Sequence, residues 1–456
     1  MTRYLDTQTS KRVSLSKVLL LLQSLVCTLQ STGAHFPLIG HNNEDLLSVI
    51  ADGDARIDWV DRYSPVLNGM VRKTLADGSL KGRKIAVVVH LEAKTAFLAL
   101  VLADAGAEVI VAGSNPRTTN QSVVEALRDR GLIVVADAGG DLKSWEKELL
   151  AAADHEPEFV IDDGAELTMR IGMHRPELFK RLKGVSEETT TGTARLLAME
   201  AAGKLPFPAL TANEARCKHM FDNRYGTGQT TMQAVLRLTN RQIAGATITI
   251  IGYGYVGRGI AEYARKMGAN VQIVEIDPVR AVEAHMDGNT VGTAKDMVPG
   301  ASMIVTATGG IRAIGKPELQ RVDHDVVLAN AGHHDLEVDV DTLADMASSQ
   351  TESRPQITTY CVNDRAIHVL SGGALVNIAG GSGHPVEIMD LTFSVQGLGA
   401  HVLVNAGLAP GVHVLSKELD DSIASAYLES RGIHLDPVRP EQADDFKRCI
   451  DGMPSV

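Results

Sequence analysis

The chain has 456 residues, of which 44% are hydrophobic, so it is long enough to bury more than one core and two or three domains are expected. Its formal net charge is −12 with no run of five like charges, which argues against a nucleic-acid groove and against an anionic membrane as partner and favours a small molecule. The four cysteines lack CxxC spacing, so we expect no disulfide framework and no metal site, and a reducing cytoplasm fits.

Residues 11–34 join basic side chains to an apolar run and superficially resemble a secretory signal. The apolar residues recur at helical spacing, however, while Gln23 and Ser24 interrupt them. We therefore expect a packed amphipathic helix within an N-terminal helical extension of residues 1–50. No other segment approaches the roughly 20 apolar residues of a membrane-spanning helix, so a soluble protein is expected.

Short apolar runs alternate with helical patterns in two series. The first runs from Lys84 through "KIAVVVH", "EVIVAG", "GLIVVAD" and "EFVIDDG", and the second starts at Thr247 with "TITIIGYG", "NVQIVEID", "SMIVTATG" and "DVVLANAG". This alternation predicts an α/β fold with two doubly wound parallel sheets. Between them, residues 217–240 predict a connector and a long helix, and hinges are expected there and in the glycine-rich segment 371–385.

The second series contains "GYGYVG" between a predicted strand and a predicted helix. Gly252 permits the tight turn, Gly254 lets the backbone approach a pyrophosphate, and Gly257 allows close packing of helix and strand. Glu275 follows at the end of the next strand, where a carboxylate accepts from ribose hydroxyls and favours NAD over NADP. Arg280 could tolerate a 2′-phosphate, but the carboxylate would repel that group, so NAD is expected.

Polar clusters follow the apolar strands of the first series, where parallel sheets bind ligands. They contain His90, Asp163 and Glu188, and the connector adds Lys218 and Asp222 at i and i+4, which share one face of a helix. Each could be structural by itself, as a helix cap or an exposed ion pair.

Together these motifs resemble one family. "HLEAKTA", "SNPRTTN", "IDDGAELT", "SEETTTG", "FDNRYGTGQ", "GYGYVGRG", "NAGHHDLEVD", "LVN" and "GHP" occur in the order seen in S-adenosylhomocysteine hydrolases, and two of them resemble the archaeal and thermotogal branch. The resemblance implies a substrate domain of residues 51–222 and 385–418, an NAD-binding domain of residues 223–384 and a C-terminal tail of residues 419–456. It also implies a homo-oligomer, either a tetramer or a dimer.

The resemblance further implies the chemistry. Tightly held NAD removes hydride from the ribose 3′-hydroxyl, the ketone acidifies the C4′ proton, the thiol leaves from C5′, water adds, and the hydride returns. Lys218 and Asp222 would assist removal of the 3′-hydroxyl proton, with the pKa of Lys218 lowered by its surroundings. Glu188 would bind the ribose hydroxyls, and Asp163 and His90 would serve at C4′ and C5′.

The remaining expected site residues follow from the same resemblance. His333 and Asn213 should lie near the nicotinamide and the sugar. The other substrate contacts are expected to be Glu92, Lys94, Thr95, Asn120, Glu166 and His384. The cofactor contacts are expected to be Thr189, Thr190, Thr191, Asn223, Gly252, Gly254, Tyr255, Val256, Gly257, Glu275, Arg280, Thr308, Asn330, Gly332 and Asn377.

Several positions depart from the family pattern on the homocysteine side. Asn120 replaces a glutamine, Glu166 replaces an aspartate, and Ala374 stands where an arginine is expected. Loss of the arginine matters most, because a guanidinium suits an amino-acid carboxylate. At the base pocket, Glu92 and Lys94 make hypoxanthine conceivable in place of adenine, as in S-inosylhomocysteine. The C-terminus lacks the Lys and Tyr that many members extend into a neighbouring subunit.

Three functions stay open at this point. The first is hydrolysis of S-adenosylhomocysteine or a close analogue. The second is a specialised relative that uses the same 3′-ketone on a free nucleoside, such as a nucleoside 3′-epimerase. The third is a catalytically silent NAD-binding regulator, which the retention of Lys218, Asp222, Asp163, Glu188 and His90 disfavours.

Overall fold

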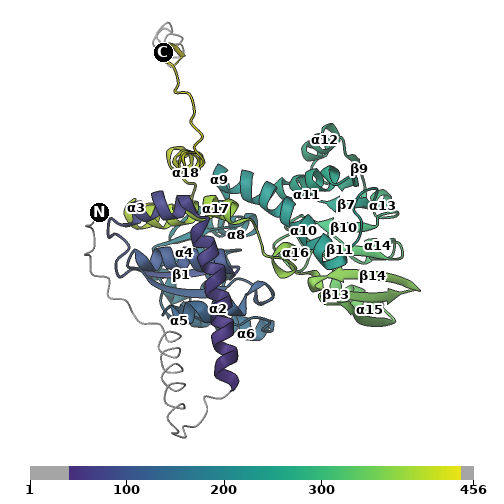
Figure 1. Ribbon diagram of the computed structural model, residues 1–456, viewed down its shortest axis with the longest axis horizontal. Helices are drawn as coiled ribbons and strands as arrows, with labels where there is room; N and C mark the ends of the chain where they lie inside the picture. Colours follow the sequence, from purple (N-terminus) through teal and green to yellow (C-terminus); the bar gives the residue numbers. More distant parts are fainter. Residues whose placement is uncertain (1–40, 443–456) are drawn as a thin grey trace, which may run out of the picture.

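The computed structural model describes residues 41–442, which form two lobes that each contain one sheet (Figure 1). The predicted helix at residues 11–34 lies outside the described residues. Within residues 41–442, no helix combines the length and hydrophobicity needed to cross a bilayer. The prediction of two doubly wound sheets is confirmed. The sheet of the second lobe also has an antiparallel edge, which we did not predict.

The first lobe contains a seven-stranded sheet in which every neighbouring pair is parallel. Its central strands are β-branched and buried on both faces, as parallel strands between helical layers require. In spatial order the strands are β15 (Gly411–His413), β6 (Pro208–Thr211), β5 (Gly184–Glu187), β4 (Phe159–Asp162), β1 (Lys84–Val89), β2 (Glu108–Gly113) and β3 (Ile133–Val134).

Helices cover both faces of this sheet. One core contains residues of α2 (His41–Arg62), α4 (Ala93–Asp104), α5 (Gln121–Asp129) and α17 (Val386–Asn405), and α2 packs on α4 and α5. The opposite core contains residues of α6 (Leu142–Asp154), α7 (Glu166–His174) and α8 (Thr190–Ala201). Smaller elements are η1 (Leu67–Val71), α3 (Arg72–Leu75), η2 (Pro116–Thr118), η3 (Pro176–Lys180) and η4 (Ala212–Glu214).

The second lobe contains an eight-stranded sheet that is parallel except at one edge. Six strands are parallel. In spatial order, ending at the edge strand β9, they are β14 (Arg365–Leu370), β11 (Val326–Asn330), β10 (Met303–Thr306), β7 (Thr247–Ile251), β8 (Asn270–Val274) and β9 (Thr290–Gly292). β13 (Ile357–Val362) pairs antiparallel with β14, and β12 (Ser349–Arg354) pairs antiparallel with β13 at the edge of the sheet. Asn363 and Asp364, both at positive φ, form the tight turn between β13 and β14.

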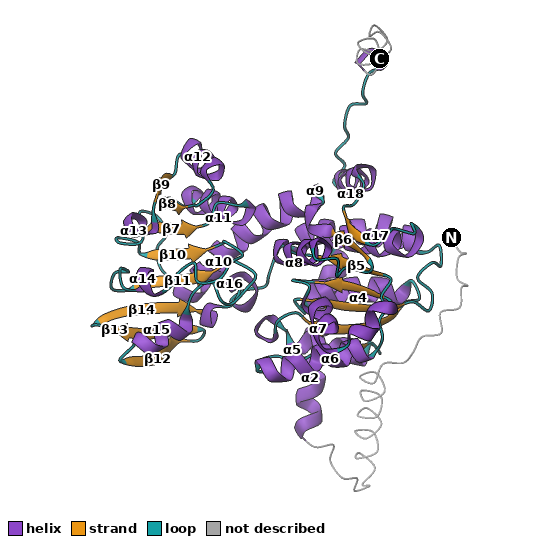
Figure 2. Cartoon of the chain, turned by 180° about the vertical axis from the view of Figure 1, so that it is seen from behind, coloured by secondary structure: helices purple, strands orange, loops and turns teal. Residues whose placement is uncertain are grey.

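The helices of the second lobe surround its sheet (Figure 2), and their buried residues divide between two cores. α10 (Thr227–Thr239), α11 (Tyr255–Lys266) and α16 (Val376–Ala379) contribute to one core. α14 (Lys316–Leu319) and α15 (Val340–Met346) contribute to the other, where α13 (Ala294–Met297) also packs. α12 (Pro278–Met286) covers the β8–β9 edge, and η6 (Ser371–Gly373) follows β14.

The chain passes between the lobes twice. The first passage runs from α9 (Arg216–Lys218) through a π-helical turn, η5 (His219–Gly226), into the predicted long helix α10, and the second runs from α16 to α17. The expected boundaries at residues 50 and 418 fall inside α2 and α18 (Lys417–Ser430). α18 packs on the first lobe, where the Asp420 carboxylate accepts hydrogen bonds from the backbone N–H groups of Arg216 and Cys217 at 2.8 and 3.0 Å.

Candidate active site

One cavity is lined by residues of both lobes, at the carboxyl ends of the two parallel sheets. All six residues that we expected to be catalytic line it: His90, Asp163, Glu188, Lys218, Asp222 and His333. Glu92, Lys94, Thr95, Thr189, Asn223, Asn377 and His384 line it as well. Segments that are far apart in the sequence therefore meet here, and the roles assigned to these residues stay predictions.

A buried cluster of charged side chains around Lys218 forms one side of the cavity. Nζ of Lys218 donates to Oδ1 of Asp222 at 3.1 Å and to Oδ1 of Asn223 at 2.8 Å, and it lies 3.5 Å from Oε1 of Glu188. The second carboxylate oxygen of Asp222 lies 3.2 Å from Nδ1 of His384. Lys218, Asp222 and His384 thus form a continuous chain of contacts.

Burial and neighbouring charges set the protonation of this cluster. Burial alone would lower the pKa of Lys218, but Asp222 and Glu188 outweigh it, so the pKa of Lys218 is raised. Our expectation of a lowered pKa for Lys218 is therefore wrong for this state of the site. Burial raises the pKa of Glu188 to about 8. Burial opposes ionisation of Asp222, yet His384 and Lys218 hold the pKa of Asp222 well below its usual range.

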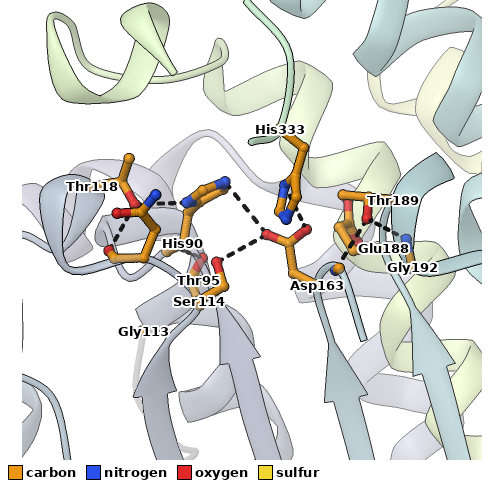
Figure 3. Close-up of polar contacts among 12 residues, drawn as sticks. His90, Thr95, Gly113, Ser114, Thr118, Asp163, Glu188, Thr189, Gly192 and His333 are labelled. Carbon is orange, nitrogen blue, oxygen red and sulfur yellow. Dashed lines mark hydrogen bonds and ion pairs between the residues drawn. The ribbon is translucent and has the colours of Figure 1, made fainter. Parts of the chain in front are cut away.

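His90, Asp163 and His333 form the other side of the cavity (Figure 3). Nε2 of His90 and Nδ1 of His333 lie 3.6 and 3.5 Å from the two oxygens of Asp163. Burial lowers the pKa of His90 to about 4, so this imidazole is neutral near pH 7. The hydroxyl of Ser114 donates to Oδ2 of Asp163 at 3.2 Å.

The tautomer of His90 follows from its other nitrogen. Nδ1 lies 2.6 Å from Oγ1 of Thr118, and that hydroxyl donates to the carbonyl of Asn115 at 3.0 Å. Nδ1 of His90 must then carry the proton, which leaves Nε2 as an acceptor. Nε2 of His90 and Oδ1 of Asp163 are both buried without a hydrogen-bond partner. Two unpaired acceptors on neighbouring side chains can accept hydrogen bonds or protons from a bound molecule, such as one that carries a hydroxyl group.

Backbone geometry beside Asp163 depends on one glycine. Gly164 has a φ of +81°, and a Cβ at this position would lie 2.5 Å from Nε2 of His333. Its N–H donates to the buried carboxyl group of Glu187 at 2.9 Å. Gly164 therefore lets His333 of the second lobe approach the turn that carries Asp163.

A second ion pair lies at the base-binding end that the sequence predicted. Nζ of Lys94 lies 2.7 Å from Oε2 of Glu92 and donates to the carbonyl of Ser382 at 2.9 Å. Lys94 is 6% exposed, so its ammonium is held in the cavity wall rather than in solvent. The apolar side chains of Met389 and Phe393 line the same cavity.

Three residues that we expected to contact the substrate instead bond to other residues of the protein. Asn120 caps α5, where its side-chain oxygen accepts from the backbone of Ser122 and Val123. Glu166 is paired with Arg170 and with Arg195, the latter at 2.8 Å. Asn213 bonds Thr190 and Asn223 through its amide. None of the three lines the cavity, so their contacts with substrate stay predictions.

The glycine turn has the geometry that a dinucleotide requires. Gly252 has a φ of +99°, and a Cβ on Gly257 would lie 1.9 Å from the carbonyl oxygen of Gly252. At Gly254, in contrast, a Cβ would meet only Nη1 of Arg280, at 3.7 Å. The backbone is thus open on one side at Gly254, at the N-terminus of α11, where phosphate groups bind.

Glu275 lies beside this turn, where it accepts from the N–H of Tyr253 at 2.7 Å. Tyr255 is exposed, and its ring lies 4.9 Å from that of His219. Arg280 is exposed and Val256 is partly buried.

The other expected cofactor contacts lie between this turn and the cavity. The hydroxyl of Thr191 is 3.9 Å from the Cβ position at Gly309, which places α8 beside the loop after β10. Asn377 lines the cavity, and its Oδ1 is buried without a partner. Asn330 uses its amide within its own loop, donating to the carbonyls of Gly332, His334 and Gly373. The open Gly254 and the unpartnered Asn377 fit an NAD molecule that runs from α11 to the cavity.

Two groups of side chains could hold a metal ion by distance, because their ligand atoms lie within 4.8 Å of one another. The first is His90, Asp163 and His333, and the second is Glu166, His333 and His334. Glu166 is already neutralised by two arginines. Both groups share His333, so they compete for one side chain.

Sequence reasoning missed several polar residues that support the site. Gln396 donates to Glu188 at 2.6 Å, Thr392 donates to Asp222 at 3.1 Å, and both come from α17. Glu337 accepts from the backbone of Thr308 and Gly309, which fixes the loop after β10. The signal for the first two was present, because Thr392 and Gln396 are polar residues one helical turn apart in a helix whose mean composition is apolar.

Comparisons with known proteins agree with this architecture. Residues 45–175 match the family model described as S-adenosyl-L-homocysteine hydrolase, and residues 223–383 match its NAD binding domain. The expected NAD cofactor is thereby confirmed. The chain is 42% identical over 393 residues to an adenosylhomocysteinase of Thermotoga maritima, covering 86% of this chain and 97% of that protein. It is 39% identical over 393 residues to an S-inosyl-L-homocysteine hydrolase of Methanocaldococcus jannaschii, covering 86% and 95%.

Proposed function

The chain belongs to the S-adenosyl-L-homocysteine hydrolase family, and on this premise we propose that it catalyses the reversible hydrolysis of S-adenosylhomocysteine or S-inosylhomocysteine to a nucleoside and homocysteine. The observation that carries the proposal is the meeting of two buried groups in one cavity. Lys218, Asp222 and Glu188 lie on one side, and His90, Asp163 and His333 lie on the other.

Bound NAD supplies reversible oxidation of the ribose 3′-hydroxyl, which makes the adjacent C4′ proton acidic. The residues of this chain bind the sugar and move protons. Glu188, neutral at pH 7 because of its raised pKa, can donate to a ribose oxygen. Lys218 is charged at rest and must lose its own proton before it accepts one from the 3′-hydroxyl. Its contact with Asp222, and through Asp222 with His384, offers a path for that proton.

Removal of the C4′ proton is assigned to Asp163 or His90. Each has a buried acceptor atom without a partner, and the two atoms belong to adjacent side chains. The other member of the pair is then placed to handle the water or the leaving thiol at C5′. His333, from the second lobe, closes this end of the cavity over Asp163.

The test is to incubate purified protein in deuterated water with S-adenosylhomocysteine, S-inosylhomocysteine or adenosine, and to follow products and NADH absorbance. Release of homocysteine supports the proposal. Deuterium in a nucleoside of changed sugar configuration, without thiol chemistry, would indicate a 3′-epimerase instead. Lys218→Ala should abolish the NADH signal, whereas Lys183→Ala, an exposed lysine paired with Glu158, should leave it unchanged.

We also propose that the protein works in the cytoplasm as a homo-oligomer, either a tetramer or a dimer. The free state of Cys217 and Cys361 supports a reducing compartment. α12 and Ile276, two residues before it, leave apolar side chains in solvent, with Ile276 97%, Met286 79% and Val279 76% exposed, which supports a protein contact. Light scattering of the purified protein tests the assembly, and a monomeric mass would refute it.

A further inference from the structure

One arginine of the first lobe reaches across to the second lobe. Arg117, in the 3₁₀ turn η2, donates from Nη1 to the carbonyl of Gly372 at 3.1 Å. The same Nη1 lies 3.4 Å from Oδ2 of Asp335. The Arg117 side chain is 54% exposed and that of Asp335 is 22% exposed, so the pair remains accessible to a ligand.

Arg117 and Asp335 do not line the cavity themselves, but their chain neighbours connect them to the side that contains His90, Asp163 and His333. Thr118, the residue after Arg117, holds Nδ1 of His90, and Asp335 is two residues beyond His333. Asn115 ties the two segments together by donating to Oδ1 of Asp335 at 3.2 Å. A substituent on C5′ of a nucleoside that reacts between His90 and Asp163 would extend toward Arg117 and Asp335.

The other cations near the cavity are more fully engaged. Lys218 is buried among Asp222, Asn223 and Glu188. Lys94 is held by Glu92 and Ser382, and the Arg195 guanidinium contacts Glu166 and the carbonyl of Gly164. Arg117 has one acidic partner, at a distance longer than a charge-assisted hydrogen bond.

The chain offers no guanidinium at residue 374, because Ala374 is fully buried in the segment that follows β14. The Arg117 guanidinium instead approaches this segment from the opposite lobe. Its Nη1 would lie 3.6 Å from a Cβ at Gly372, two residues before Ala374. A positive charge is therefore present beside this segment, although it belongs to another part of the sequence.

We propose that Arg117 and Asp335 form the subsite for the amino-acid end of the substrate's thiol arm. Arg117 takes the α-carboxylate, for which a guanidinium fork is suited, and Asp335 takes the α-ammonium. A zwitterion brings one charge of each sign, so it can replace the internal pair without leaving either side chain unpaired. The inference rests on the proposed function, since it assumes a nucleoside thioether of an amino acid.

The test uses the holoenzyme in the direction of synthesis, with adenosine and three thiols. Homocysteine carries both charges, 4-mercaptobutyrate lacks the ammonium, and 3-mercaptopropylamine lacks the carboxylate. Arg117→Leu should raise KM about 10- to 100-fold for homocysteine and for 4-mercaptobutyrate, as expected for loss of a charged hydrogen bond, and leave 3-mercaptopropylamine unaffected. Asp335→Asn should raise KM for homocysteine and 3-mercaptopropylamine and leave 4-mercaptobutyrate unaffected.

Arg181→Leu is the matched control, because Arg181 is 60% exposed and pairs with Glu156 on the surface of the first lobe. KM for adenosine and the NADH signal should stay at the wild-type level in all three variants. An unchanged KM for homocysteine in Arg117→Leu, or an equal rise for all three thiols, overturns the subsite. A wild-type protein that forms no thioether with any thiol overturns the proposed function instead.

Discussion

Glu188 and Lys218 share one buried site, and their protonation is linked. Both are less than 10% exposed, and the Lys218 ammonium lies 3.5 Å from the Glu188 carboxyl. At pH 7 the raised pKa values leave Lys218 charged and Glu188 neutral, while Asp222 is ionised. The cluster then carries one positive and one negative charge, which a buried site tolerates better than a net charge.

Glu188→Gln should flatten the pH dependence of stability. The pKa of Glu188 is raised from 4.5 to about 8, so the folded protein holds a proton that the unfolded chain loses. The stabilising contribution is therefore full below pH 4.5 and is lost as the pH rises through 8. We expect the melting temperature of the NAD-free protein to fall less between pH 5 and pH 8 in Glu188→Gln than in the wild type, by roughly a few degrees.

The control for this measurement is Glu177→Gln, which changes an exposed glutamate. It should reproduce the wild-type slope of melting temperature against pH. Equal slopes for Glu188→Gln and the wild type would contradict a raised pKa for Glu188.

Lys94 should favour a hypoxanthine base, and Glu92 should favour an adenine base. An ammonium donates only, so Lys94 can bond the 6-oxo group of hypoxanthine, whereas the Glu92 carboxylate can accept from the 6-amino group of adenine. Lys94→Met should lower kcat/KM for S-inosylhomocysteine about tenfold more than for S-adenosylhomocysteine. Glu92→Gln should change the ratio in the opposite direction, and steady-state kinetics with both substrates measures it. If the ratio of kcat/KM for the two substrates is unchanged in both variants, the base does not bind beside Lys94 and Glu92.

At the scale of elements, α17 supports both carboxyl groups of the cluster around Lys218, those of Asp222 and Glu188. Met389, Thr392, Phe393 and Gln396 follow one another at helical spacing, so they share the face that lies toward the cavity. The hydroxyl of Ser186 donates to Oε1 of Gln396, which turns the amide so that its NH₂ group faces Glu188. A helix that begins at the second passage between the lobes thus sets the geometry of these side chains.

Gln396→Leu should raise the pKa of Glu188 further, because the carboxylate loses its donor. The expected change is about one pKa unit, the size of a hydrogen bond to a charged group. It should appear as an upward shift in the pH at which the rate of NADH formation from adenosine changes. Ser394→Ala, two residues away, removes a hydroxyl that bonds only its own helix and should leave the pH profile in place. A simple loss of rate with an unmoved profile would indicate a structural role only.

The elements were predictable where the signal is local. Apolar strands, the alternation of strand and helix, and the turn at Gly252, Gly254 and Gly257 depend on residues close in sequence, and the structure has them where expected. The antiparallel edge was missed although Asn363 and Asp364 form a turn suited to a hairpin. β12 has no buried residue, so it lacks the apolar pattern that identifies a strand.

At the scale of the whole molecule, the sequence predicted those site residues that belong to the motifs shared with the family. All six expected catalytic residues line one cavity. Glu166, which we expected to bind substrate, does not line this cavity. It pairs with Arg170 and Arg195, and neither pairing was evident from its motif. The direction of the pKa shift of Lys218 was also mispredicted. Burial lowers this pKa, but Asp222 and Glu188 together raise it, and Glu188 lies thirty residues away on a different element.

Asp420→Ala should loosen the segment that carries Lys218. The Asp420 carboxylate accepts from the N–H groups of Arg216 and Cys217, so it caps α9 in place of a local residue. Loss of a cap costs about 1 kcal/mol, and hydrogen exchange at residues 216–226 should accelerate roughly fivefold. The NADH signal with adenosine should weaken in parallel.

Asp421→Ala is the control, because the neighbouring Asp421 is exposed and pairs with Lys417 and Arg216 side chains. Hydrogen exchange at residues 216–226 should match the wild type in this variant. Unchanged exchange in Asp420→Ala as well would show that α9 is held by its packing rather than by the cap.

The cap from α18 has a consequence for synthesis of the protein. During translation, Lys218 leaves the ribosome about two hundred residues before Asp420, which α9 needs as its cap. β15, which completes the edge of the first sheet next to β6, is also made late. The nucleotide-binding lobe between them can fold as the chain emerges, since domains fold as units during synthesis. We therefore expect the lysine segment to become ordered last, after the nucleotide-binding lobe has folded.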